Sequence, residues 1–162
     1  MNLVLMNKTK RGVIAGIIVV SVIVIGVWTL SIKPTTDVAS SNEIMLMHIH
    51  PRLYLNFNEK PYFVPQNVGI DPDLWKNHSL DQYGMKGMAP VHTHTADGMI
   101  HVESTVVRNY TLGEFFDVWG FDLKGDTITV TSYGESISNW KNHVLKDDEP
   151  IIMNITSGKQ VG

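Results

Sequence analysis

The sequence predicts an α+β fold, a small β-grasp-like domain in which one short helix covers a mixed β-sheet. Several segments alternate between apolar and polar residues with the period of two that half-buried strands show. The segment TLGEFFDVWG (111–120) has instead the apolar spacing of a short amphipathic helix. Along the chain these segments follow the order hairpin, long loop, strand pair, helix, strand and strand, which indicates an α+β domain. A cupredoxin-like β-sandwich is the alternative.

The first hairpin is predicted at 45–66. Apolar residues occupy one parity of the segment 45–57, and His48 and His50 occupy the other, so both histidines should point away from the core. A tight turn at 58–60 and a returning strand at 61–66 complete the hairpin. Residues 67–90 then form a long connection, and connections of this length usually carry function or disorder.

A second strand pair is predicted around VHTHTADGMIHVEST (91–105), with a turn at Ala96-Asp97-Gly98. In its second half Ile100 and Val102 share one parity, and His101 and Glu103 share the other. The histidine side is therefore expected to be the face turned away from the core. Asp97 is interpreted as the turn residue before the glycine.

The helix at 111–120 has clear end signals. Thr111 and Glu114 have the spacing of a capping box, and Gly120 suits the left-handed residue that ends many helices. Strands are expected at 127–133 and 150–156, and Trp140 and Leu145 should fill the core between them.

The first 43 residues predict a membrane anchor. An uncharged apolar run at 12–32 has the roughly 20 residues that a helix needs to cross a bilayer. The basic residues of segment 1–11 place that end in the cytoplasm, and the C-terminal domain outside the cell membrane in a single-pass arrangement. A cleaved signal peptide, cut near residue 39, is the alternative. Residues 33–43 form a polar linker, 44–157 the His-rich domain and 158–162 a tail.

Composition excludes several functions. The net charge of −3 gives no reason to expect a nucleic-acid partner, and the absence of cysteine excludes disulfides and thiolate metal sites. The sequence contains no G-x-S-x-G nucleophile motif, no Walker phosphate-binding loop and no H-E-x-x-H zinc motif. It therefore assigns no catalytic residue and no organic cofactor.

The histidines predict a metal site. Residues i and i+2 of a strand project from the same face, so H-I-H, H-T-H and H-V-E can each direct two ligands at one ion. Imidazoles with a carboxylate suit copper or zinc better than calcium or magnesium. Glu103 is either a ligand or a group that orients a ligand imidazole. The isolated His78 and His143 are expected to be ordinary surface or loop residues. The predicted ligands are His48, His50, His92, His94, His101 and Glu103.

The series HIHPRLYLNFN, VPQNVGI, HTHTADGMIHVEST and YTLGEFFDVWG resembles a family of small membrane-anchored or exported bacterial and archaeal proteins. It is most similar to versions from ammonia-oxidising archaea, whose extracytoplasmic chemistry relies on copper. The resemblance covers about residues 45–155 and implies a location outside the cytoplasm, without naming an activity. Where the family pattern has H-T-H-D, this chain has Thr95, and its acid is displaced to Asp97.

Taken together, these features predict a membrane-anchored extracytoplasmic metal-binding protein that handles copper or zinc or assists a membrane enzyme. Its expected partners are the lipid bilayer, through residues 12–32, and a membrane protein complex. One alternative is a small metal-dependent enzyme with Glu103 as general base. Another is a structural accessory subunit of a membrane complex.

Overall fold

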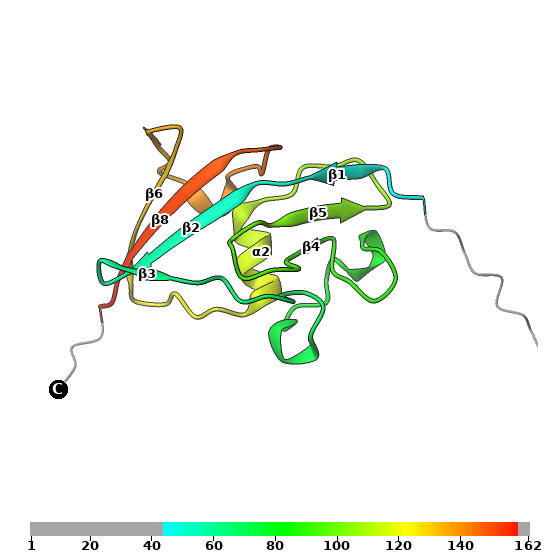
Figure 1. Ribbon diagram of the computed structural model, residues 1–162, viewed down its shortest axis with the longest axis horizontal. Coiled ribbons are helices and arrows are strands. Elements are labelled where there is room, and N and C mark those ends of the chain that lie inside the picture. Colours follow the sequence, from blue (N-terminus) through cyan, green and yellow to red (C-terminus); the bar gives the residue numbers. More distant parts are fainter. Residues whose placement is uncertain (1–43, 159–162) are drawn as a thin grey trace, which may run out of the picture. The chain divides into compact units, whose positions relative to one another are not determined.

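The computed structural model describes residues 44–158, which form an α+β domain of two open sheets and one short α-helix (Figure 1). The predicted segments 1–11, 12–32 and 33–43 lie outside the described residues, as does the tail beyond Gly158. Among the helices of the described part, none has the length and apolar character that a membrane crossing requires.

The smaller sheet contains three short antiparallel strands. Strand β5 (His101–Ser104) lies at its centre, between β1 (Met47–Ile49) and β4 (Val91–His92). The larger sheet has the order β3-β2-β8-β6-β7. It is mixed, because β2 pairs with β8 in parallel and the other pairs are antiparallel. Its strands are β2 (Arg52–Phe57), β3 (Lys60–Tyr62), β6 (Thr127–Ser132), β7 (Glu135–Ser136) and β8 (Pro150–Thr156).

The division into two sheets corrects the expectation of one mixed sheet. The alternating segment 45–57 is broken at Pro51, which has no backbone N–H and so cannot donate a strand hydrogen bond. The chain passes directly from β1 of one sheet into β2 of the other (Figure 1). The Pro51 carbonyl accepts from the Ile100 N–H, and the next N–H, that of Arg52, donates to the Glu149 carbonyl. Pro51 is therefore where the chain changes sheets.

The helix α2 (Leu112–Trp119) confirms its predicted ends. Thr111 and Glu114 form the capping box, and Gly120 adopts the left-handed conformation with φ 72°. The helix buries Leu112, Phe115, Phe116, Val118 and Trp119 in the core, and Figure 1 shows it beside the strands of both sheets.

The prediction that the apolar residues of one parity face the core is confirmed in the regular strands. Leu53 and Leu55 of β2 are buried, as are Ile100 and Val102 beside and within β5. Met45 departs from the prediction, since it precedes β1 and is 39% exposed.

The connections differ from the prediction mainly in length. The hairpin turn has Asn58 and Glu59 at positive φ, and β3 ends at Tyr62, earlier than the predicted strand 61–66. The long connection before β4 contains two 3₁₀ turns, Pro72–Leu74 and Asp81–Tyr83, and a third, Trp140–Asn142, precedes β8. Because β4 ends at His92, His94 lies in the loop that follows it.

Candidate metal centre

One face of the three-stranded sheet gathers the predicted ligands. The antiparallel register places His48 opposite Glu103, and His92 opposite His101. Residues directly opposite each other in such a ladder share a face. The alternate residues of β5 and its flank, Ile100 and Val102, are fully buried in the core. Strand parity therefore explains why two distant segments direct their histidines to the same place.

An inner group consists of His92, His94, His101 and Glu103. One ligand atom from each lies within 4.8 Å of all the others. The Nε2 atoms of His92 and His94 are 3.1 Å apart, and the Glu103 carboxylate is 3.5 Å from His101 Nδ1. Ligands about 2.0–2.1 Å from a tetrahedral ion lie roughly 3.3 Å from one another. These two distances fit such an ion, whereas Glu103 lies 3.9 Å from His92 Nε2 and 4.0 Å from His94 Nε2 and would move closer on binding.

His92 is held in place by the long loop that precedes it. Its side chain is fully buried, and its Nδ1 lies 2.8 Å from the Ala89 carbonyl, so Nδ1–H donates and Nε2 carries the lone pair. The Ala89 N–H in turn donates to the Gly69 carbonyl at 2.7 Å. Burial lowers the pKa of His92 to about 4, which keeps the imidazole neutral at neutral pH.

His101 carries a buried nitrogen without a hydrogen bond. The side chain is only 16% exposed, and its Nδ1 makes no hydrogen bond with any of residues 44–158. Burial is the main cause that lowers its pKa, followed by repulsion from His94 and His50. Unpaired buried polar atoms are uncommon in folded proteins and call for an explanation, such as an ion that binds there.

Glu103 lies at the centre of the cluster. Its side chain is 12% exposed, and its backbone N–H donates to the Pro90 carbonyl at 3.0 Å. Four imidazoles approach its carboxylate. Oε1 is 3.3 Å from His48 Nε2, 3.5 Å from His101 Nδ1 and 4.0 Å from His94 Nε2, and Oε2 is 3.9 Å from His92 Nε2.

An outer group consists of His48, His50 and His101, and one ligand atom from each again lies within 4.8 Å of the others. The rings of His48 and His50 are 4.4 Å apart between centroids. Both side chains are partly exposed, at 46% and 32%. The five predicted histidines therefore come together, but as two groups that share His101.

The expectation that His48, His50, His101 and Glu103 face away from the core agrees with the exposure of His48, but Glu103 is nearly buried. His92, for which parity predicted no face, is fully buried. The end of the long connection covers this part of the face, because Ala89 and Pro90 are buried and hydrogen-bond to His92 and Glu103. Strand parity could not reveal that cover, which comes from outside the strands.

Asp147 is a further polar residue at the site that sequence reasoning missed. Its Oδ1 accepts the His50 backbone N–H at 2.8 Å and lies 3.8 Å from the ring Nδ1 of the same residue. It lies 97 positions from His50 in the chain, and no local pattern connects the two segments.

Asp97 is confirmed as a turn residue. Its carboxylate accepts from the Thr95 hydroxyl at 2.6 Å, the Met99 N–H at 3.1 Å and the Arg52 guanidinium at 3.0 Å. These hydrogen bonds, that of Thr95 first, lower the pKa of Asp97 to about 2. It orders the loop between β4 and β5 and is not a member of either histidine group.

The two remaining histidines lie elsewhere. His78 is an exposed residue paired with Asp81 at 2.9 Å, as expected of a surface histidine. His143 is only 14% exposed, and it shares the buried Glu149 carboxylate with the Ser132 hydroxyl at 2.9 Å and 2.6 Å respectively. This contact ties the segment before β8 to β6, so His143 is a structural residue and not a free surface histidine.

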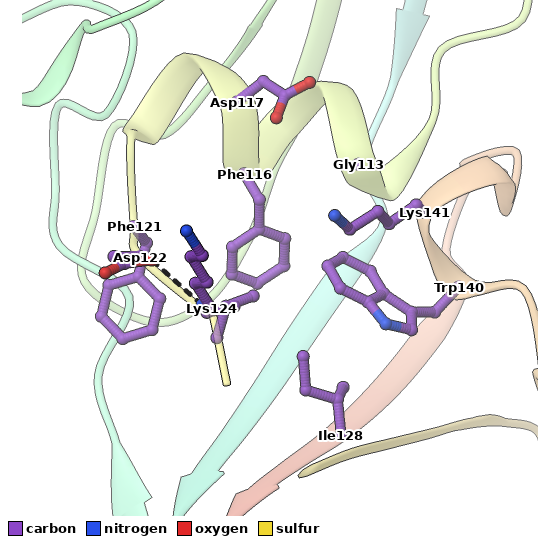
Figure 2. A pocket seen from close by; sticks show the side chains of 10 residues that line it. Gly113, Phe116, Asp117, Phe121, Asp122, Lys124, Ile128, Trp140 and Lys141 are labelled. Carbon is purple, nitrogen blue, oxygen red and sulfur yellow. Dashed lines mark hydrogen bonds between the residues drawn. The ribbon is translucent and has the colours of Figure 1, made fainter. Parts of the chain in front are cut away.

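A separate hollow of about 460 Å³ lies beside helix α2 (Figure 2). Phe116, Phe121, Ile128 and Trp140 line it with apolar surface, and Lys124 and Lys141 lie at its sides. No histidine lines this hollow, so it is distinct from the metal centre.

Comparison with family models, curated proteins and solved structures found no match.

Proposed function

We propose that this protein binds a copper or zinc ion through His92, His94, His101 and Glu103. The observation that carries the proposal is the convergence of one ligand atom from each of the four residues within 4.8 Å. Imidazole nitrogens with one carboxylate oxygen suit copper and zinc. The hydrogen bond from His92 to the Ala89 carbonyl supports the proposal, because ligand imidazoles commonly donate their second N–H to such an acceptor.

Metal handling is favoured over catalysis. Three imidazoles and a carboxylate complete the four-coordinate shell of a structural zinc ion, whereas catalytic sites keep one position open. Glu103 also lies among four imidazoles at 3.3–4.0 Å, which suits a ligand better than a free general base. If Glu103 were the base of an enzyme, Glu103→Gln would abolish turnover while the ion stayed bound.

The location and partners are proposed from the sequence. Residues 12–32 would anchor the chain in the membrane with the domain outside, where it would exchange metal with a membrane protein complex. We favour copper slightly over zinc, because the sequence resembles proteins of ammonia-oxidising archaea.

Metal analysis of the purified full-length chain in mild detergent tests the proposal. After loading with Cu²⁺ or Zn²⁺ and removal of excess metal, we expect stoichiometric bound metal. The variant His92→Ala/His94→Ala should lose the inner ion, whereas His78→Ala should not, because His78 lies away from the cluster beside Asp81. A wild-type chain without bound metal, or bound metal unchanged in the double variant, would contradict the proposal.

A further inference from the structure

We propose that the histidine cluster holds two ions, the second at His48 and His50 with Glu103 and His101 as the groups shared with the first. This inference rests on the proposed function, because it takes the inner group as the first ion position. It adds a second position and a shared carboxylate to that site.

The number of donors is the first argument. The cluster contains five imidazoles and one carboxylate, which exceeds the four ligands that a zinc site takes. The donors also divide in space, because neither His48 nor His50 belongs to the inner group, and His92 and His94 do not belong to the outer one. An ion in the inner group would leave the rings of His48 and His50, which are 4.4 Å apart, without an ion to bind.

Glu103 is placed to join the two positions. Among the imidazoles beside it, His48 of the outer group is closest to Oε1 at 3.3 Å, and His92 of the inner group is 3.9 Å from Oε2. A carboxylate in this position can give one oxygen to each ion. Pairs of ions joined in this way typically lie about 3.5–4 Å apart. Because β1 pairs with β5, His48 is held directly opposite Glu103 by the sheet itself.

His101 is the second shared residue. Its ring lies 4.8 Å from that of His50 and 4.6 Å from that of His94, so it stands between the two groups. Its buried Nδ1 has no hydrogen-bond partner among the described residues. An imidazole has two ring nitrogens, so His101 can serve either ion and, if it loses both protons, both of them.

Charge near the outer group supports a second cation. Two divalent ions a few ångströms apart repel each other, and anionic groups must offset that repulsion. Glu103 lies between the groups, and Asp147 Oδ1 is 3.8 Å from His50 Nδ1. Asp147 also accepts the His50 backbone N–H at 2.8 Å and thereby fixes this end of β1 near the carboxylate.

The two positions should differ in affinity. The outer group offers fewer residues of its own and its histidines are partly exposed, whereas the inner group contains the fully buried His92. We therefore expect stepwise binding, with the inner ion held more tightly.

The test counts ions on the full-length chain in detergent, by elemental analysis and by calorimetric titration with Cu²⁺. We expect two ions per chain for wild type and for the control His78→Ala, and one for His48→Ala/His50→Ala. Electron paramagnetic resonance adds a readout of proximity. The wild-type pair should show a coupled, weakened signal, and the double variant should restore the spectrum of a single Cu²⁺.

The outcomes separate this inference from the function on which it rests. One ion in wild type, lost only from His92→Ala/His94→Ala, would overturn the second position and leave the proposed function intact. Two ions in His48→Ala/His50→Ala, or two uncoupled Cu²⁺ signals in wild type, would also overturn it. No bound ion would overturn the proposed function itself. Circular dichroism and the milder variant His48→Gln/His50→Gln guard against loss of fold as the cause.

Discussion

His101 and His92 illustrate how two histidines of one cluster can differ in what they contribute to stability. They lie directly opposite each other on β5 and β4. His92 Nδ1 donates a hydrogen bond to the Ala89 carbonyl at 2.8 Å, whereas the buried Nδ1 of His101 makes no hydrogen bond among residues 44–158 and lies 3.5 Å from Glu103 Oε1. In the metal-free protein His92 therefore stabilises the fold through a hydrogen bond, whereas the buried Nδ1 of His101 has only the longer contact with Glu103.

This contrast gives a prediction at the residue scale. In metal-free protein, His101→Leu should change the free energy of unfolding by less than about 1 kcal/mol, because an apolar group replaces an imidazole whose buried Nδ1 makes no hydrogen bond. His92→Leu should cost about 1–3 kcal/mol, because it leaves the buried Ala89 carbonyl without its donor. Urea denaturation after chelation measures both. Both variants should nevertheless lose metal, and a larger cost for His101→Leu than for His92→Leu would contradict this interpretation.

At the scale of elements, the turn between β4 and β5 positions the two halves of the inner group. Gly98 has φ 81°, and its carbonyl accepts the Leu53 N–H at 2.8 Å. A methyl group at this position would overlap the Leu53 carbonyl oxygen of β2. The turn is thus pressed against the larger sheet and needs glycine for both its conformation and its space.

We expect Gly98→Ala to destabilise the domain by more than about 1 kcal/mol and to weaken metal binding as the turn shifts. Gly87→Ala is the matched control, because Gly87 also has φ 81° but a Cβ there would meet no atom within 4 Å. The difference between the two variants in urea denaturation isolates the contact with Leu53. Equal losses of stability in the two variants would mean that the contact with Leu53 adds nothing to the cost of placing alanine at positive φ.

The elements also show how far the sequence could predict this molecule. Local signals were sufficient for α2, with its Thr111 cap and Gly120 end, and for β8 at Pro150–Thr156. Strand parity predicted that His101 and Glu103 share a face. It could not predict which strands pair, because the parallel β2–β8 pairing joins segments nearly 100 residues apart. The split of strands at Pro51 and the cover over His92 depend on those same distant contacts.

At the scale of the whole described domain, the cluster joins parts of the chain that are far apart in sequence. His48 and His50 precede the passage from one sheet to the other, His92 ends β4, His94 lies in a loop, and His101 and Glu103 belong to β5. β1 and β4 are very short, so their backbone hydrogen bonds alone give the smaller sheet little strength. An ion bound by these side chains would hold β4, β5 and the intervening loop together.

Metal should therefore stabilise the fold as a whole. A ligand that binds only the folded state adds about 2.7 kcal/mol when its free concentration is 100 times its Kd, which corresponds to a rise in Tm of roughly 10 °C for a domain of this size. Thermal denaturation of the full-length chain with Zn²⁺ should show this rise, and a chelator should reverse it. Mg²⁺ at the same concentration should have little effect, because it prefers oxygen ligands. His92→Ala/His94→Ala should lose most of the shift. If that variant rises as much as wild type, the ion stabilises the protein from another site, and the inner group is not where it binds.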